Sequence, residues 1–211
     1  MQTIEVTLPP DIYHQSVNTK FVNLFIRSGY TMATPEITNW VDLTLFDGIF
    51  TKREAMKNYR KAIINKLTFQ NVLDEKLKLE AFEIIAKNRK MFDRPIHMTF
   101  EDLIETSKVF PIDFFLVRDI NNISVGSAIF YRGHPKIVHG TFWGDTELGS
   151  PLRTMDFLVM NLYNYYKGLV FSYIDIGISS VAGTPNEDLI RFKETHNCTS
   201  SLRFTFSWSS P

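Results

Sequence analysis

Hydrophobic positions in the second half of the chain form continuous runs with short polar breaks. Beyond Pro111 three runs follow one another, broken only at Asn121-Asn122 and at 133–135, and they cover residues 112–117, 123–131 and 137–143. Connections this short join antiparallel neighbours, so the pattern predicts a three-stranded meander. A fourth run, residues 170–178, is apolar on both faces, which is typical of a central strand covered by helices.

Elsewhere, apolar residues recur at helical spacing. This spacing, with N-cap residues and turn residues as boundaries, predicts helices over residues 12–26, 51–66, 74–85, 99–108, 150–168 and from 184 onward. Thr51 and Thr99 each have the form of a capping box, and Ser150-Pro151 has the form of a helix start that ends at Gly168. Alternating or β-branched segments predict further strands at residues 37–45, 67–73 and 202–208.

Composition and charge exclude several classes of protein. Lys plus Arg and Asp plus Glu both number 23, so no net field draws the chain toward nucleic acid or an anionic membrane, although a local basic patch stays open. Cys198 is the only cysteine, so an intrachain disulfide is excluded. Without a signal-peptide pattern, a run of ~20 apolar residues or metal-ligand spacing among the histidines, we expect a cytoplasmic protein with no membrane partner and no metal.

The order of the predicted elements from Leu67 onward is strand, helix, helix, three meander strands, helix, strand, helix, strand. Two local segments, 173–179 and 189–194 with Asn186 between them, resemble the C-terminal segment of the Fem-like branch of the GNAT acyltransferase superfamily. The resemblance implies a mixed α/β GNAT-like fold over residues 67–211, with a mostly antiparallel central sheet flanked by helices. Residues 1–66, a helix-strand-helix extension, are similar to the join into the second Fem unit, which implies a remnant of a first GNAT-like unit.

The resemblance also implies where a cofactor would bind. In the GNAT fold a thioester lies where the fourth and fifth strands part, here residues 136–143 and 170–178, and the next loop holds a cofactor phosphate at a helix N-terminus. Acetyl-CoA or CoA is then the expected cofactor, and the residues expected to contact it are Thr141, Phe142, Trp143, Gly149, Ser150, Leu152, Asn186 and Lys193. Gly140 would permit a β-bulge there, or it could simply fit beneath a large neighbour.

Three positions in these segments depart from the GNAT pattern: Thr146 replaces the usual Gln or Arg, Pro151 replaces the last Gly or Ala, and Lys193 is the third. Pro151 has no N–H to offer a phosphate, so a plain helix start is the alternative for this loop. Lys193 stands where many GNAT enzymes have a tyrosine; in Fem-like proteins this lysine resembles a phosphate contact, and the alternative is an exposed helix lysine.

Asp175 is the first candidate for a catalytic acid or base, because it lies within an otherwise apolar strand. A buried carboxylate must be paired, hydrogen-bonded or shifted in pKa, so the alternative is a structural role, either capping a loop or pairing with Arg191. Glu147 and Tyr173 are the other catalytic candidates, and Asp145 and His139 could also carry a proton.

Three functions follow. The first is an N-acyltransferase that moves an acyl group, acetyl from acetyl-CoA, to the amine of a small molecule or peptide. The second is a Fem-like aminoacyl transferase that uses charged tRNA, for which Lys193 and Arg60-Lys61 would contact phosphate. The third is a GNAT-shaped binding module without chemistry. A homodimer is an open alternative to a monomer.

Overall fold

Two compact units make up the chain in the computed structural model, which describes residues 2–94 and 96–210. The first unit contains the segments up to Val41, Asp175–Glu194 and from Cys198 onward, and the second contains Asp42–Ile174 and Thr195–Asn197. The contacts therefore group the N-terminal segment with the C-terminal strands, whereas the boundary expected at residue 66 followed chain order. The origin of residues 1–66 as a remnant stays a prediction.

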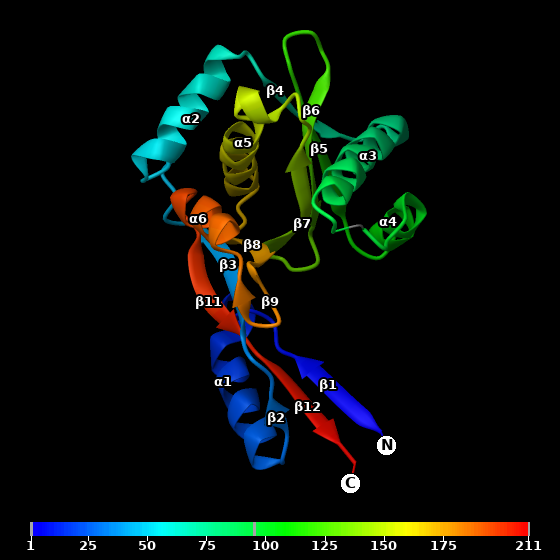
Figure 1. Cartoon of the computed structure of the whole chain (residues 1–211), viewed down its shortest axis with the longest axis vertical. Coiled ribbons are helices and arrows are strands. Elements are labelled where there is room, and N and C mark those ends of the chain that lie inside the picture. The colour runs from blue at the N-terminus through cyan, green and yellow to red at the C-terminus, as the bar shows by residue number, and fades with distance from the viewer. Residues whose placement is uncertain (1, 95, 211) are drawn as a thin grey trace. The chain divides into compact units, whose positions relative to one another are not determined.

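The second unit is built on four antiparallel strands in the order β7-β6-β5-β4. Their bounds are β4 (Thr68–Val72), β5 (Ile112–Arg118), β6 (Ser124–Tyr131) and β7 (Ile137–Asp145), so the predicted meander is confirmed. One face carries α3 (Glu75–Met91) and α4 (Phe100–Ser107), and the other carries α5 (Thr154–Gly168) with α2 (Arg53–Ile64) packed on it (Figure 1).

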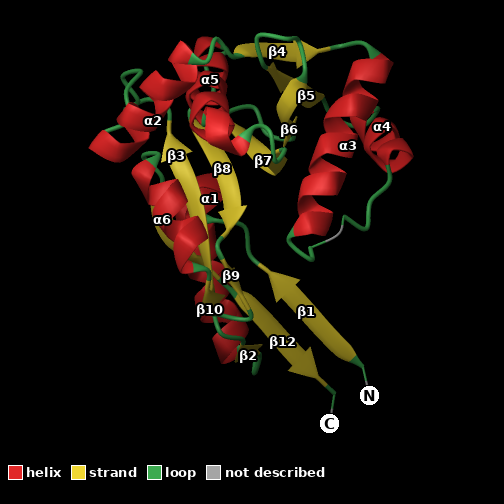
Figure 2. Cartoon of the chain, turned by 45° about the horizontal axis from the view of Figure 1, so that its top comes forward, coloured by secondary structure: helices red, strands yellow, loops and turns green. Residues whose placement is uncertain are grey.

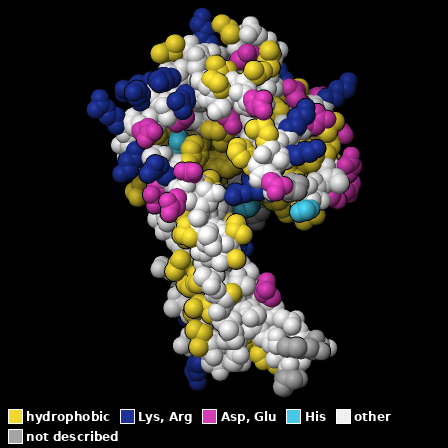
Figure 3. All heavy atoms as spheres, in the orientation of Figure 1, with side chains coloured by type: hydrophobic (Ala, Val, Ile, Leu, Met, Phe, Trp, Pro, Cys, Tyr) yellow, Lys and Arg dark blue, Asp and Glu magenta, His cyan; other side chains and the backbone are white. Residues whose placement is uncertain are grey.

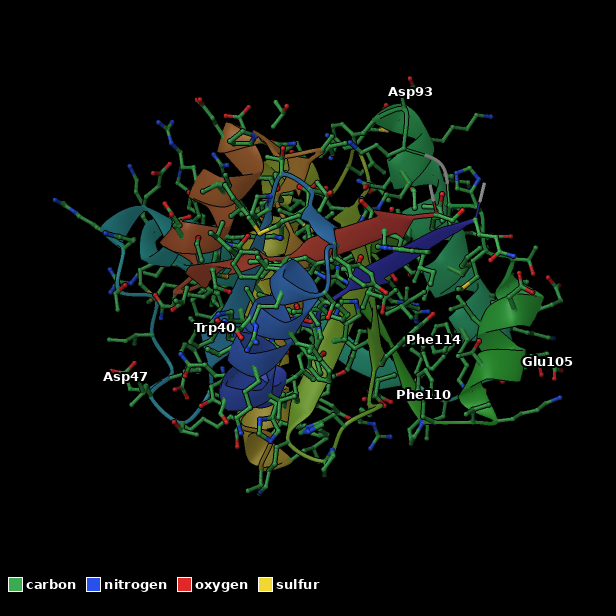
Figure 4. The ribbon with its side chains drawn as sticks, turned by 90° about the horizontal axis from the view of Figure 1, so that it is seen from below. Trp40, Asp47, Asp93, Glu105, Phe110 and Phe114 are labelled. Carbon is green, nitrogen blue, oxygen red and sulfur yellow. The ribbon has the colours of Figure 1, made fainter. Side chains whose placement is uncertain are left out.

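Strand β5 is buried on both faces, and its residues between Asp113 and Arg118 are all apolar. Phe114 packs into the cluster formed with α3 and α4, whereas the Phe115 ring lies 5.1 Å from that of Tyr165 on α5. Figure 4 shows the α4 side of this layer, with Phe114 on the inner side of the helix and Glu105 on its outer side. Successive strand residues point to opposite faces, so a continuous apolar run is what two helical layers require.

Helix starts were predicted with mixed success. Asp74 caps α3 by accepting from the Lys76 and Leu77 amides, and Thr99 and Asp102 form the predicted capping box of α4. The capping box at Thr51 was wrong: α2 begins after Lys52 without a side-chain cap. The Thr51 amide and hydroxyl both donate instead to Asn197 Oδ1, at 2.9 Å, so a tertiary contact replaces the local one.

Two further helix starts lie later than predicted. Ser150–Leu152 form a single 3₁₀ turn, η1, and α5 begins at Thr154 because Arg153 adopts a left-handed conformation with φ 63°. Helix α6 (Glu187–Thr195) is capped by Asn186, whose Oδ1 accepts from the Leu189 amide at 3.0 Å, and Thr184 lies in strand β10 (Thr184–Pro185).

The first unit holds α1 (Asp11–Arg27), as predicted, and a small antiparallel sheet in the order β1-β12-β2 (Figure 2). The bounds of these strands are β1 (Thr3–Thr7), β2 (Thr31–Met32) and β12 (Thr205–Ser209). It also holds the antiparallel pair β3 (Glu36–Asp42) and β11 (Thr199–Arg203), the short strand β9 (Ser180–Val181), and β8 (Tyr173–Ile178) from Asp175 onward. The single final strand predicted over residues 202–208 was wrong, because β11 pairs with β3 and β12 pairs with β1 and β2.

Candidate functional site

Strand β7 carries a β-bulge. Ile129 of β6 pairs with Phe142 and the next residue, Phe130, pairs with Gly140, which leaves Thr141 as one extra residue on β7. The bulge expected from Gly140 is therefore present. Thr141 Oγ1 is buried and has no hydrogen-bond partner among the residues that the structure describes. A bulge takes the extra residue out of regular register with the neighbouring strand, so the β6–β7 ladder is interrupted at Thr141.

The residues after the bulge anchor β7 to both layers. Phe142 packs against the cluster under α3 and α4, and the Trp143 ring lies 6.4 Å from that of Phe130, edge to face. An ideal Cβ on Gly144 would come within 2.6 Å of the Asn88 side chain of α3. Thr141 is thus the polar member of the three β7 residues that sequence analysis expected at a cofactor.

The loop from β7 to α5 already uses its amides. Within residues 149–154, the N–H groups of Gly149 and Ser150 donate to the Thr146 carbonyl, those of Leu152 and Thr154 donate to the Gly149 carbonyl, and that of Arg153 donates to Ser150. Pro151 has no N–H. In this conformation the segment offers a phosphate no free amide.

Gly149 is required by close packing rather than by backbone conformation. An ideal Cβ would lie 2.2 Å from the Val125 carbonyl oxygen and 3.0 Å from Thr154 Oγ1. We expect Gly149→Ala to lower the free energy of unfolding by about 1–3 kcal/mol, the usual cost of overpacking. Gly133→Ala is the matched control, since nothing lies within 4 Å of its ideal Cβ. Equal urea midpoints for the two variants would contradict this packing role.

Two carboxyl groups lie around this loop. Asp145 ends β7, and Asp156 lies in the first turn of α5, buried and 3.1 Å from Nε2 of the buried His196. Burial, with a further contribution from the charge of Asp156, raises the pKa of Asp145 to about 6. The Asn88 amide of α3 donates to the Asp145 carbonyl at 2.7 Å. Carboxylates near a helix N-terminus make it a poor site for binding an anion. The pKa of Asp145, in contrast, lies in the range in which a general base is effective.

The raised pKa of Asp145 makes stability depend on pH. Because the folded pKa lies above the ordinary value of 3.8, the neutral form stabilises the fold, and this contribution is present below pH ~4 and is lost as the pH rises through about 6. We expect the free energy of unfolding to fall by about 1–2 kcal/mol across that window, after allowance for partial solvent screening. Asp145→Asn should remove this part of the pH dependence in urea titrations; an unchanged profile would contradict the assignment.

In the first unit, polar contacts gather at the end of β8. Asp175 is 4% exposed; its Oδ2 accepts from the Tyr13 hydroxyl at 3.1 Å and its Oδ1 from the Gly177 amide at 2.9 Å. Burial, and then the charge and hydrogen bond of Asp175, raise the pKa of Tyr13, so this hydroxyl stays a donor. Sequence analysis missed Tyr13, because a tyrosine near the start of an amphipathic helix carries no sign of a partner 162 residues away.

Lys193 is buried rather than exposed. The residue is 2% exposed to solvent. Its Nζ donates to three successive backbone carbonyl oxygens, those of Ile176 (3.2 Å), Gly177 (2.9 Å) and Ile178 (3.0 Å). Asn186, also expected at a cofactor, caps α6 as described above. Lys193 therefore fixes the backbone at the end of β8, and Asn186 fixes the start of α6.

The remaining candidates have simpler surroundings. Glu147 and Ser150 are exposed on the loop after β7, and Leu152 is half-buried, with its carbonyl accepting from Asn65 at the end of α2 (3.1 Å). Tyr173 is half-buried at the start of β8, where its amide donates to the Lys136 carbonyl. Over residues 2–94 and 96–210 no group of three or more His, Cys, Asp or Glu side chains could hold a metal ion. In the same ranges, every helix is too short or too polar to cross a membrane.

Comparison with known proteins establishes the fold. No family model and no curated protein matches the sequence. Solved structures do match: FemX superposes with a TM-score of 0.73 at 11% identity, over 99% of this chain and 72% of FemX. A C-terminal domain from Agrobacterium fabrum, described as that of a lysylphosphatidylglycerol synthetase, gives 0.66 at 12% identity, over 90% of this chain and 65% of the domain.

A GCN5-related N-acetyltransferase from Sphaerobacter thermophilus gives a TM-score of 0.55 at 15% identity, over 98% of this chain and 59% of that protein. The chain thus spans less than two thirds of the synthetase domain and of the acetyltransferase. At these identities the likeness establishes the fold alone. The chain has the mixed α/β, mostly antiparallel fold of the GNAT superfamily, with a Fem-like protein among its structural neighbours, as the sequence resemblance predicted.

Proposed function

We propose that this protein is an acyltransferase that moves an activated acyl group to an amine. The observation that carries the proposal is the bulge at Thr141 on the β7 strand of a GNAT fold. Acyl transfer to an amine passes through an oxyanion, which unpaired backbone N–H groups stabilise best when they are fixed in advance. We propose that the backbone at Thr141 provides such a group, fixed in place because Phe142 and Trp143, the next two residues, pack against the layers on either face of the sheet.

Asp145 is the residue we propose as general base. It lies on the same strand as the bulge, and alternation puts it on the same face of β7 as Trp143. Its pKa of about 6 makes it ionised at neutral pH but still basic enough to take a proton from an ammonium nucleophile through water. Asp175 and Tyr13, which share a hydrogen bond, are the second acid-base pair, and Tyr173 is a weaker candidate. The exposed Glu147 is not part of this proposal.

Two donors fit acyl transfer. Acetyl-CoA is the donor expected of a GNAT enzyme, with its thioester along residues 141–143 and its phosphates near residues 149–152. The second donor, an aminoacyl-tRNA as in Fem-like proteins, is favoured by residues 149–154, whose amides are already bonded and which have Asp145 and Asp156 as neighbours. An ester carried on tRNA does not need the phosphate loop that CoA uses.

Thermal unfolding with each donor separates the two. A ligand at ~100 times its dissociation constant adds about 2.7 kcal/mol to the native state. A higher midpoint with acetyl-CoA identifies a thioester donor, and a salt-sensitive rise with aminoacyl-tRNA alone identifies the second function. If neither donor changed the unfolding midpoint and mass spectrometry detected no acylated amine, the proposed acyltransferase activity would be contradicted.

A further inference from the structure

Helix α2 and the residues beside it concentrate positive charge in a chain whose net charge is zero. Residues 52–66 contain six basic side chains and a single acidic one, Glu54; the basic ones are Lys52, Arg53, Lys57, Arg60, Lys61 and Lys66. All six are exposed. Figure 3 shows Lys and Arg side chains gathered over α2. The neutral total therefore conceals a local basic surface.

The helix is amphipathic in an unusual way, because its outer face is both basic and apolar. Arg53, Lys57, Arg60 and Ile64 are spaced i, i+4, i+7 and i+11, which places them in one line along the helix. Ile64 is 76% exposed at the end of this line, and Ile63 beside it is 49% exposed. We call Arg53, Lys57, Arg60, Lys61, Ile63 and Ile64 the α2 outer face.

The inner face explains why the outer one is free. Ala55 and Ala62 are buried, and Tyr59 stacks on Phe157 of α5 with ring centroids 6.3 Å apart. The packing of α2 is thus complete without its isoleucines. Two large branched side chains in water next to four cations need a partner that is anionic and also has an apolar layer.

We propose that the α2 outer face docks on an anionic lipid bilayer surface. Lysine and arginine side chains would contact the headgroup phosphates while Ile63 and Ile64 enter the acyl boundary, which is how an interfacial amphipathic helix binds. The helix lies on the surface and does not span the bilayer. This docking is independent of the acyl donor, and it replaces the sequence expectation of no membrane partner, which rested on net charge and on the lack of a spanning segment.

RNA is the main alternative occupant, and the face is poorly built for it. RNA-binding surfaces pair cations with exposed aromatic side chains on which bases stack. The only aromatic residue of α2 is Tyr59, and it is half-buried against α5. Exposed isoleucines gain nothing from phosphates, whereas they gain burial in a lipid interface.

The test is co-sedimentation of the full chain with vesicles of phosphatidylcholine, with and without phosphatidylglycerol. We expect binding only to the phosphatidylglycerol vesicles, weakened by salt. The variant Lys57→Ser/Arg60→Ser should lose at least roughly tenfold in vesicle affinity, given the contribution of each basic residue near an anionic surface. Ile64→Ser should weaken binding several-fold and leave its salt dependence unchanged.

Matched controls come from α3. Lys87→Ser/Lys90→Ser removes two exposed cations from another helix, and Leu79→Ser replaces a partly exposed apolar residue there. Both should bind vesicles as the parent chain does. Absence of sedimentation with phosphatidylglycerol vesicles would overturn the proposal. So would an Ile64→Ser variant with full vesicle affinity, or a bulk tRNA that binds the α2 outer face more tightly than the vesicles do.

Discussion

Replacing Lys193 with methionine is expected to lower the free energy of unfolding by about 3 kcal/mol, because three carbonyl oxygens lose a charged donor at once. Methionine keeps most of the buried volume, so the loss reports the hydrogen bonds rather than a cavity. Urea unfolding followed by circular dichroism measures it. If Lys193 were instead a surface contact for a donor phosphate, Lys193→Met would weaken binding of the acyl donor and leave the free energy of unfolding unchanged.

Lys61→Met is the matched control for this prediction. It removes a lysine from an exposed position on α2, where such changes usually stay within about 0.5 kcal/mol. If Lys193→Met came within 1 kcal/mol of Lys61→Met, the buried ammonium would not hold the end of β8 as described.

Asp145→Asn is expected to reduce kcat/KM for acyl transfer by about 10²–10⁴-fold, the usual contribution of a general base. Asparagine has nearly the same shape but cannot accept a proton. In the parent enzyme kcat/KM should rise with pH through about 6, where Asp145 loses its proton, and the variant should lack that rise. Initial rates across pH 5 to 8 provide the measurement.

Glu147→Gln is the control for that experiment, since it removes an exposed carboxylate two residues further along the same loop. It should leave both the rate and its pH profile unchanged. If Glu147→Gln lost activity and Asp145→Asn did not, the proton would pass through the exposed loop, and the proposed base would be wrong. Asp175→Asn, tested in parallel, reports whether the Tyr13 pair takes part in the reaction.

Hydrophobic periodicity, bounded by cap and turn residues, was enough to place most elements, because β5 and β6 are buried as continuous runs and α3 and α4 each have an apolar face. The meander, α3 and α4 follow from local signals that the structure uses directly. The errors at Thr51, Ser150 and Thr184 have separate causes. Thr51 bonds Asn197, Ser150 opens a 3₁₀ turn that the left-handed Arg153 ends, and Thr184 pairs with Val181 in a short strand pair. The split between β11 and β12 depends on strand partners that a single sequence does not show.

The candidate site was predicted in part. Gly140 correctly indicated a bulge, since a glycine within an apolar strand signals an irregular ladder. The burial of Lys193 could not be predicted, because its three acceptors are backbone carbonyls and have no residue signature. Asp145 gained importance only from its surroundings, as burial and the neighbouring Asp156 set its pKa. The α2 outer face was visible as a basic helix, yet the exposure of Ile64 required the packing of Ala55, Tyr59 and Ala62.

Acyl transfer itself is tested most directly by mass spectrometry of a panel of primary amines incubated with the purified chain and either acetyl-CoA or aminoacyl-tRNA. We predict an acylated amine with one donor, formed by the parent chain and by Glu147→Gln and strongly reduced with Asp145→Asn. If no amine is acylated with either donor, or if Asp145→Asn acylates as fast as the parent, then this GNAT fold does not perform the proposed reaction.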